Sequence, residues 1–363
     1  MAYALDLAAR GLGTVWPNPA VGCLIYDDAG PDGALIAQGW TAPGGRPHAE
    51  TIALEAAGGA ARGATLYVSL EPCAHHGETP PCAEALVAAR VGRVVIATTD
   101  ADPRVAGKGI DRLRKAGIEV AVGLLEKEAR QLNAGFFKRL ESGRPLVTLK
   151  LASSLDGRIA TAGGDSKWIT GDAARAHGHM MRARHDAVLV GIGTVLADDP
   201  GLDCRLPGLG ERSPLPVVAD SGLRIAPDSR LVTAAAERGL MVLCRQPVPR
   251  EKAAALRARG VEVIEVPAGE DDRPDLAEGL AALGAHGITR LLVEGGGQLA
   301  ASLLRGRLVD RIAWFRGPVL IGGDGVAAIG GLGIGDMAGA LRLVPGERRI
   351  FGDDILETFT IGP

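Results

Sequence analysis

Short apolar runs alternate with alanine-rich segments of helical length along this chain, and this alternation is the feature that most constrains its fold. Such alternation is typical of α/β domains, in which helices cover the faces of a sheet. It is interrupted at 142–145 (Ser-Gly-Arg-Pro), where glycine and proline end a long predicted helix. Because 363 residues exceed one ordinary core, we predict two α/β domains, residues 1–144 and 145–363.

The hydrophobic periodicity and the turn residues predict the elements of both domains. In the first domain we predict strands over 21–26, 34–40, 65–70, 94–98 and 118–122, and helices over 48–57, 82–90, 110–116 and 126–140. The first two strands form a hairpin with its turn in 27–33. In the second domain we predict strands over 146–152, 187–190, 217–219, 241–244, 261–266, 290–293, 312–315, 341–343 and 355–360.

The composition restricts the partners and the compartment. The net charge is −3 with acids and bases interspersed, unlike the basic stripe of a duplex nucleic-acid binder. No apolar run reaches the roughly 18–20 residues of a membrane span, and the first residues lack the basic flank of a signal peptide. Five cysteines are sparse and odd in number, which favours a reducing compartment with thiols available for metal. We therefore expect a cytoplasmic protein with neither nucleic acid nor membrane as a partner.

Three short segments of the first domain together predict a metal site. His48-Ala49-Glu50 opens a predicted helix, Glu71-Pro72-Cys73 ends a strand, and Cys82 opens the next helix. One imidazole and two thiolates give zinc three protein ligands and leave a position for water, as a catalytic zinc requires. His-x-Glu followed by Pro-Cys-x-x-Cys is the signature of zinc nucleobase deaminases, but here eight residues separate the cysteines. We predict His48, Cys73 and Cys82 as ligands of one zinc ion per chain, and Glu50 as the catalytic proton shuttle.

Three other interpretations of these residues remain open. His75, His76 or Cys23 could supply a fourth ligand and close a purely structural zinc site, or the cysteines could be ordinary core thiols. A structural site, however, has no need for a carboxylate two residues after its histidine. A deaminase acting on bases in RNA would share the motif but should show a basic surface, which the balanced charge does not favour.

Two glycine-rich turns stand out in the second domain. Gly191-Ile192-Gly193-Thr194 and Glu294-Gly295-Gly296-Gly297 each follow a predicted strand. Such turns let the backbone amides at a helix N-terminus meet a phosphate. Neither turn is a complete G-x-G-x-x-G fingerprint, so the residues alone leave simple turn chemistry as an equal alternative.

Together, these segments resemble the bifunctional riboflavin-biosynthesis deaminase–reductase family, in which the longer spacing between the cysteines is the expected form. The resemblance covers almost the whole chain, although Trp16 is bulkier than expected and 221–285 contains no recognisable motif. Its motifs are Asn18-Pro19-Ala20-Val21-Gly22, His48-Ala49-Glu50, 71–82 (Glu-Pro-Cys-Ala-His-His-Gly-Glu-Thr-Pro-Pro-Cys), 150–157 (Lys-Leu-Ala-Ser-Ser-Leu-Asp-Gly), 166–170 (Ser-Lys-Trp-Ile-Thr), 193–200 (Gly-Thr-Val-Leu-Ala-Asp-Asp-Pro) and Val293-Glu294-Gly295-Gly296.

The resemblance implies a cytidine-deaminase-like three-layer domain followed by a dihydrofolate-reductase-like domain. The first would use zinc to deaminate 2,5-diamino-6-(5-phosphoribosylamino)pyrimidin-4(3H)-one at ring position 2. The second would use NADPH to reduce the ribosyl side chain to ribityl, giving 5-amino-6-(5-phosphoribitylamino)uracil. Asn18 would hydrogen-bond the substrate, although an Asn-Pro turn residue is the alternative, and His75 and Thr79 could contact it.

The resemblance also implies contacts in the second domain. An arginine fork suits a phosphate, which is consistent with two of the substrate contacts. Lys150 or Asp156 could assist proton transfer, but a structural salt bridge is equally compatible with the sequence. We also expect the chain to form a homo-oligomer. The implied NADPH contacts are Ala152, Trp168, Thr194, Asp198, Gly296, Gly297, Gln298, Leu299, Ala300, Ala301 and Ser302, and the implied substrate contacts are Ser166, Arg182, Leu202, Arg205 and Glu294.

Overall fold

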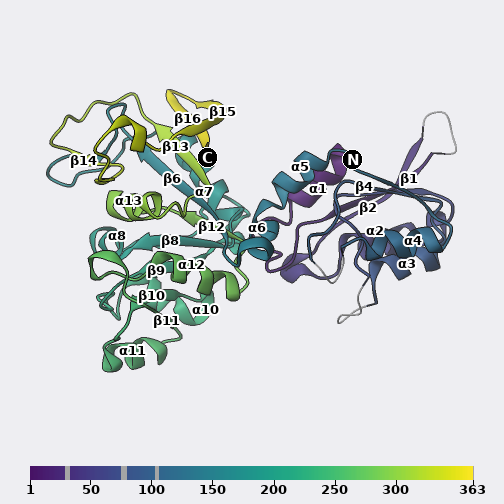
Figure 1. The fold of residues 1–363 in the computed structure, drawn as a ribbon, viewed down its shortest axis with the longest axis horizontal. Coiled ribbons are helices and arrows are strands. Elements are labelled where there is room, and N and C mark those ends of the chain that lie inside the picture. Colours follow the sequence, from purple (N-terminus) through teal and green to yellow (C-terminus); the bar gives the residue numbers. More distant parts are fainter. Residues whose placement is uncertain (29–32, 75–79, 103–105, 363) are drawn as a thin grey trace. The chain divides into compact units, whose positions relative to one another are not determined.

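The chain divides into two compact units, Met1–Gly143 and Arg144–Pro363 (Figure 1). The computed structural model describes residues 1–28, 33–74, 80–102 and 106–362. The first unit ends at Gly143, whose φ of 71° places it in the left-handed region where glycine is favoured after a helix. The division therefore falls within the Ser-Gly-Arg-Pro segment that interrupts the sequence pattern.

The N-terminal unit is built on a five-stranded sheet of order β2-β1-β3-β4-β5. An antiparallel hairpin forms one edge, β3 pairs antiparallel with β1, and the last three strands run parallel. The strands are β1 (Gly22–Asp27), β2 (Ala34–Trp40), β3 (Thr65–Val68), β4 (Arg93–Ile96) and β5 (Glu119–Val122).

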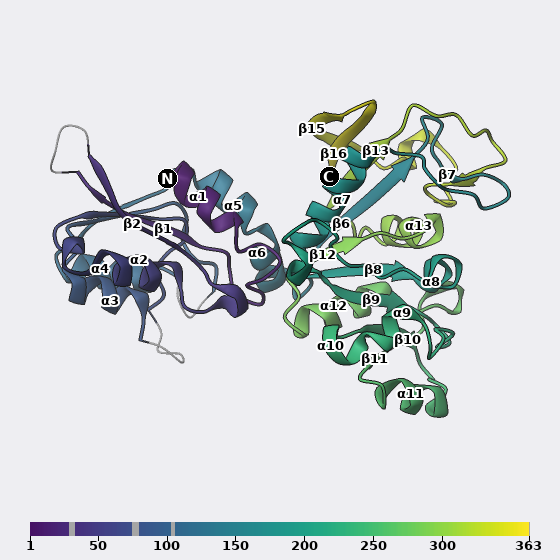
Figure 2. The same ribbon diagram turned by 180° about the vertical axis from the view of Figure 1, so that it is seen from behind.

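Helices cover both faces of this sheet and give the unit three layers (Figures 1 and 2). Successive strand residues point to opposite faces. Leu24 of β1 packs with Leu7 on one face, whereas Cys23 and Ile25 join the main core on the other. On one side lie α1 (Ala2–Ala9) and α5 (Glu126–Leu132), and on the other α2 (Ala49–Ala57), α3 (Cys82–Ala89) and α4 (Lys108–Lys115).

The long helix predicted over 126–140 is wrong, because the structure has two helices there, α5 and α6 (Ala134–Ser142). The break is at Asn133, whose φ and ψ of −93° and 19° are not helical. Its side-chain amide pairs with the backbone of Ala20, accepting from the N–H and donating to the carbonyl, both at 2.9 Å. This long-range contact fixes Asn133 between the helices. The sequence also did not predict α1.

The C-terminal unit contains a nine-stranded mixed sheet of order β11-β10-β9-β8-β12-β6-β13-β16-β15. Its first seven strands run parallel, and an antiparallel hairpin closes the other edge. The strand predicted over 341–343 departs most from the structure, because the observed strand β15 runs from Leu343 to Phe351. The strands are β6 (Leu146–Ser153), β8 (Ala187–Gly191), β9 (Leu215–Ala219), β10 (Met241–Arg245), β11 (Glu262–Val266), β12 (Arg290–Val293), β13 (Arg311–Arg316), β15 (Leu343–Phe351) and β16 (Asp354–Ile361), while β7 (Arg158–Ala160) and β14 (Val326–Ala327) form a separate small pair.

Helices pack on both faces of this sheet, because its central strands are buried apolar runs. One helix follows β8 and another follows β12, and these two strands are parallel neighbours. The two glycine-rich turns therefore lie at the same edge of the sheet, each between a strand and a helix, as predicted. The helices are α7 (Asp172–Ala183), α8 (Ile192–Asp198), α9 (Arg230–Thr233), α10 (Ala235–Arg238), α11 (Arg250–Arg257), α12 (Leu276–Ala285) and α13 (Gly297–Arg305).

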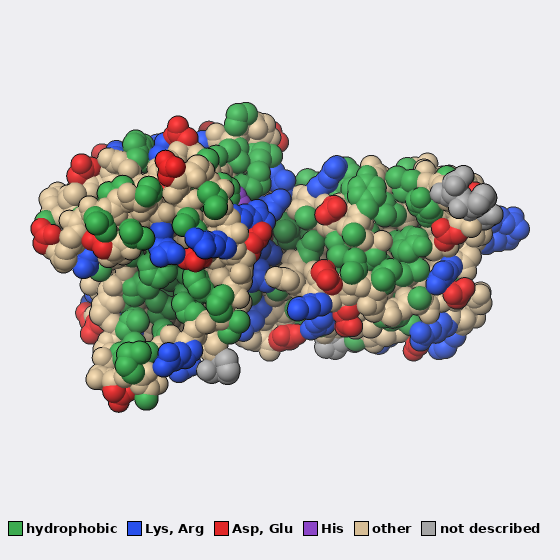
Figure 3. Space-filling view, turned by 90° about the horizontal axis from the view of Figure 1, so that it is seen from above, with side chains coloured by type: hydrophobic (Ala, Val, Ile, Leu, Met, Phe, Trp, Pro, Cys, Tyr) green, Lys and Arg blue, Asp and Glu red, His purple; other side chains and the backbone are tan. Residues whose placement is uncertain are grey.

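Two surface observations bear on possible partners. Among the helices that the structure describes, none has both the length and the apolar character needed to cross a bilayer. Acidic and basic side chains are intermixed over the face of the N-terminal unit that Figure 3 shows.

Candidate metal site and cofactor pocket

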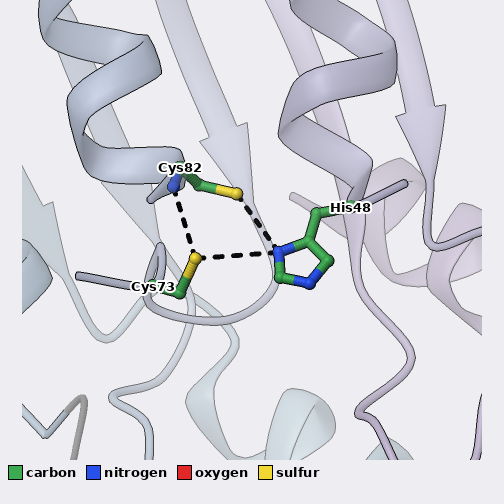
Figure 4. A group of neighbouring side chains, drawn as sticks. All are labelled: His48, Cys73 and Cys82. Atoms are coloured by element: carbon green, nitrogen blue, oxygen red, sulfur yellow. Dashed lines mark hydrogen bonds between the residues drawn. The ribbon is translucent and has the colours of Figure 1, made fainter. Parts of the chain in front are cut away.

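The three predicted zinc ligands converge at one end of the N-terminal unit. His48 is the residue immediately before α2, Cys73 lies in the segment after β3, and Cys82 is the first residue of α3. Their side chains point toward one another from these separate elements (Figure 4). Packing of α2 against α3 holds the histidine and one cysteine at a fixed separation.

The distances between the donor atoms fit a zinc ion. His48 Nδ1 lies 3.2 Å from Cys82 Sγ and 3.7 Å from Cys73 Sγ, and all three donor atoms lie within 4.8 Å of one another. In a tetrahedral site, zinc-bound nitrogen and sulfur atoms are about 3.6 Å apart, given their usual bond lengths of about 2.0 and 2.3 Å. The donor set and its spacing therefore match a His-Cys-Cys zinc site.

This is the one group of three or more possible metal ligands within the parts of the chain that are described. Cys23, a proposed fourth ligand of a closed site, is fully buried on β1 in the main core and is not part of the group. His75, His76 and Thr79 lie outside the described residues.

Glu50 lies in the first turn of α2, two residues after His48, and is only 3 % exposed. The pKa of its carboxyl is raised to about 7, chiefly by burial. His48 opposes this shift, and the nearby Cys73 sulfur adds to it. The hydrogen bond from the Cys82 thiol, together with that from His48, lowers the pKa of Cys73 to about 4. A buried carboxyl beside a thiolate and an imidazole provides both a proton carrier and the anionic ligand that zinc requires.

Asn18 lies half-buried in the segment before β1, next to Gly45. Gly45 ends a short turn, Pro43–Gly45, that leads directly to His48. The structure therefore brings Asn18 next to the segment that carries the histidine ligand.

A cavity of about 740 Å³ opens at the carboxyl ends of β8 and β9 in the C-terminal unit. The first glycine-rich turn contributes Gly191 and Gly193, whereas on the other side the lining residues belong to α13 and lie after the second turn. Three residues of the predicted cofactor segment 296–302 line the cavity, namely Gln298, Leu299 and Ser302. Ala300 and Ala301 of the same segment are fully buried. The size of the cavity is within the range of small-molecule and cofactor sites, roughly 300–1,000 Å³.

Part of this cavity wall was not predicted from the sequence. Ser221, Arg224 and Arg273 line the cavity and come from the stretch in which no motif was recognised. Ser221 follows β9, which is the parallel neighbour of β8. Ligands of open parallel sheets bind outside the carboxyl ends of the strands. This loop could therefore be recognised as part of the site only once the strand order was known.

A close backbone contact holds the start of α13 in place. A Cβ atom on Gly297 would lie 2.5 Å from the carbonyl oxygen of Ala327, and the Gly330 N–H donates to the Gly297 carbonyl at 2.8 Å. Only glycine allows this approach, which explains one residue of the glycine run.

Four of the five predicted substrate contacts of this unit are connected. Arg182 donates to both carboxylate oxygens of Glu294, at 2.7 and 2.9 Å, and to the carbonyl of Asp203 at 2.9 Å. Leu202 directly precedes Asp203 in the chain, and Arg205 Nε lies 4.0 Å from Asp203 Oδ1, although Arg205 is largely exposed. No contact connects Ser166 with this cluster among the interactions of the described residues.

Lys150 and Asp156, the two candidates for proton transfer, lie in different surroundings. Burial alone would raise the pKa of Glu294, but Arg182 and Lys150 outweigh it and lower the pKa to about 2. Lys150 Nζ lies 3.9 Å from Glu294 Oε2. Asp156 instead accepts hydrogen bonds from Ser154 Oγ at 2.5 Å and from the Gly322 N–H at 2.7 Å. Asp156 therefore fixes a loop, whereas Lys150 belongs to the Arg182–Glu294 cluster.

Four further predicted NADPH contacts are not among the residues that line the cavity. Trp168 is 66 % exposed, and the Arg175 guanidinium lies 4.2 Å from the centre of its ring. Ala152 is half-buried near the end of β6. Thr194 and Asp198 lie on α8, which follows the first glycine-rich turn.

The chemistry of the two units is that of a zinc-dependent deaminase joined to a nucleotide-using enzyme, and comparisons with known proteins agree for both halves. Residues 1–98 match the family model described as the cytidine and deoxycytidylate deaminase zinc-binding region, and residues 145–355 match the RibD C-terminal domain. The riboflavin biosynthesis protein RibD of Escherichia coli is 41 % identical over 366 residues, covering 98 % of this chain and 96 % of the relative. RibD of Aquifex aeolicus is 40 % identical, covering 99 % of this chain and 97 % of the relative.

Solved structures show the same similarity. Acinetobacter baumannii RibD, form 1, is 40 % identical with a TM-score of 0.89, covering 100 % of this chain and 98 % of that structure. The deaminase/reductase from Thermotoga maritima is 34 % identical with a TM-score of 0.85, covering 100 % and 97 %. The chain belongs to the RibD family of bifunctional riboflavin-biosynthesis deaminase–reductases. This membership confirms the predicted fold class, enzyme class and cofactors, zinc and NADPH.

Proposed function

We propose that this chain deaminates 2,5-diamino-6-(5-phosphoribosylamino)pyrimidin-4(3H)-one and then reduces its ribosyl side chain, giving 5-amino-6-(5-phosphoribitylamino)uracil. The observation that carries the first step is the convergence of one imidazole nitrogen and two thiols within 4.8 Å, next to a buried carboxyl. Domain 1–144 would carry the deamination and domain 145–363 the reduction.

In the deaminase unit, His48, Cys73 and Cys82 would hold the zinc ion. Zinc supplies a Lewis acid that makes water a usable nucleophile near neutral pH. Glu50 would pass one proton of the attacking water to the ring nitrogen and the second proton to the departing amino group, which leaves as ammonia. The burial of Glu50 supports this role, because a pKa near 7 lets one carboxyl both accept and release a proton. The Asn18 amide would hydrogen-bond the pyrimidine.

In the reductase unit, the cavity between the first glycine-rich turn and α13 would hold NADPH, which supplies the hydride. The NADPH contacts that the family resemblance implies are Ala152, Trp168, Thr194, Asp198 and residues 296–302. Arg224 and Arg273 on the cavity wall support binding of NADPH, because guanidinium groups favour the extra 2′-phosphate of that cofactor.

The substrate of the second step would bind at Ser166, Arg182, Leu202, Arg205 and Glu294. Arg182 already donates three hydrogen bonds to Glu294 and Asp203. Arg205 is therefore the guanidinium with more freedom to receive the substrate phosphate, and its exposure supports this assignment.

The remaining proposals concern the cellular compartment, the partners and the oligomeric state. The five free cysteines support a reducing, cytoplasmic compartment. The balanced charge does not favour nucleic acid as a partner, and the proposed partner is a small phosphorylated pyrimidine, with neither nucleic acid nor membrane. A homo-oligomer is proposed from the family resemblance alone.

The deaminase proposal is tested by comparing Glu50→Gln with Glu55→Gln. Both residues lie on α2, but Glu55 is exposed. We expect Glu50→Gln to keep the wild-type zinc content and to lose ammonia release, because it keeps the shape of the side chain but cannot carry the proton. Glu55→Gln should behave as the wild type. Ammonia release at the wild-type rate by Glu50→Gln would contradict the assignment.

A further inference from the structure

We infer that Gly45 is a positioning residue for deamination, because it leaves the space in which the Asn18 amide is held for the pyrimidine. The inference rests on the proposed contact between Asn18 and the substrate. It concerns a residue outside the His48, Cys73 and Cys82 ligand set.

The contact between the two residues leaves no room for a side chain at position 45. A Cβ atom on Gly45 would lie 2.0 Å from Asn18 Nδ2, 2.6 Å from Cγ and 2.8 Å from Cβ. These distances are well inside van der Waals contact, so the whole Asn18 side chain is seated against the bare glycine. Gly45 has a φ of 85°, which glycine adopts without steric cost.

The backbone around Asn18 is fixed on both sides, so its side chain cannot be relocated by a small loop shift. The Asn18 N–H donates to the Val15 carbonyl at 3.0 Å. Two residues later, the backbone of Ala20 is paired with the Asn133 amide through two hydrogen bonds of 2.9 Å. A side chain at position 45 would therefore rotate the Asn18 amide out of its place.

The same turn leads to the metal site, since Gly45 lies three residues before His48. A side-chain amide offers both donors and an acceptor, which matches the hydrogen-bonding edge of a pyrimidine. The glycine thus sets the position of the recognising amide relative to the histidine ligand without itself touching substrate.

Gly44 provides a matched control one residue away. Its φ of 77° is also left-handed, but a Cβ atom there would meet no heavy atom within 4 Å. Gly44→Ala and Gly45→Ala therefore impose the same kind of backbone strain. Only the second substitution collides with Asn18.

The test measures binding of the diaminopyrimidine phosphate by calorimetry in the Glu50→Gln protein, which should not turn the substrate over. Zinc content is measured in parallel. We expect Gly45→Ala to weaken binding about tenfold, the usual effect of one lost hydrogen bond, with zinc content unchanged. Gly44→Ala should bind nearly as the parent protein does.

A double-mutant cycle with Asn18→Gly separates this inference from the proposed function. Asn18→Gly should weaken binding about as much as Gly45→Ala, and the double variant should be no worse than either. If Gly45→Ala lowers the melting temperature more than Gly44→Ala, adding Asn18→Gly should restore it.

Several results would overturn the inference. These are equal binding by Gly45→Ala and Gly44→Ala, loss of zinc from Gly45→Ala, additive losses in the double variant, or an excess loss of stability that Asn18→Gly does not restore. Normal binding by Asn18→Gly would instead overturn the proposed substrate contact of Asn18.

Discussion

Glu71 offers a test of how the structure holds the metal-ligand segment in place. It lies two residues before Cys73, is 3 % exposed, and its carboxylate accepts four backbone hydrogen bonds. Oε2 accepts from Asp100 at 3.2 Å and Gly107 at 3.0 Å, and Oε1 from Gly109 at 3.0 Å and Ile110 at 3.2 Å. One carboxylate therefore ties the loop after β4 and the start of α4 to the segment that carries a zinc ligand.

Glu71→Gln keeps the shape of the side chain but replaces one acceptor oxygen with an amino group. Whichever way the new amide is oriented, two of the four N–H groups lose their acceptor. Each buried donor left unpaired costs about 1–3 kcal/mol, so with two such donors we expect the local structure to lose about 2–6 kcal/mol. A loss of 2 kcal/mol corresponds to roughly 30-fold faster opening-limited hydrogen exchange.

The assay is hydrogen exchange, followed by mass spectrometry on peptides that cover 106–110. The control is Glu84→Gln, whose carboxylate is 43 % exposed and pairs with Arg112 at 2.6 Å. Exposed ion pairs contribute only about 0–1 kcal/mol, so that variant should leave these amides protected. Unchanged exchange at 106–110 in Glu71→Gln would show that the Glu71 carboxylate does not hold the start of α4 in place.

Three further predictions concern pH, cofactor choice and metal binding. Burial lowers the pKa of His185 to about 3, so below its ordinary pKa near 6.5 the unfolded chain takes up a proton that the folded protein does not. The wild type should lose about 2 kcal/mol from this group between pH 7 and pH 5, and urea unfolding of His185→Gln should lack that part of the loss; equal pH dependence would contradict it. Arg224→Ala should raise KM for NADPH about tenfold with little change for NADH, because one charge-assisted phosphate contact is lost; equal effects on the two cofactors would remove Arg224 from this role. Cys82→Ala should lose zinc and ammonia release while NADPH oxidation on deaminated substrate stays largely intact, and loss of both activities would show that the domains depend on each other.

The sequence predicted those parts of the fold that local patterns determine. The strands over 34–40 and 290–293 have the predicted bounds, because alternating or continuous apolar runs and their flanking turns define them. The break between α5 and α6 was not predictable. It depends on the pairing of the Asn133 amide with Ala20, more than a hundred residues earlier in the chain.

The candidate sites follow the same rule. His48, Glu50, Cys73 and Cys82 stand in short motifs, so their chemistry could be inferred before their distances were known. The positions of Gly45 and Glu71 gain meaning only from tertiary contacts, with Asn18 and with the start of α4. The arginines of the cofactor cavity were missed for a similar reason, because strand order brings their loops to the cavity.

The most direct test of the account is metal analysis of protein purified without added zinc, combined with ammonia release and NADPH oxidation on the diaminopyrimidine phosphate. We expect about one zinc ion per chain, held by one histidine and two cysteines, and ammonia release that precedes NADPH oxidation. Zinc without either activity would contradict it and would favour a closed, structural metal site.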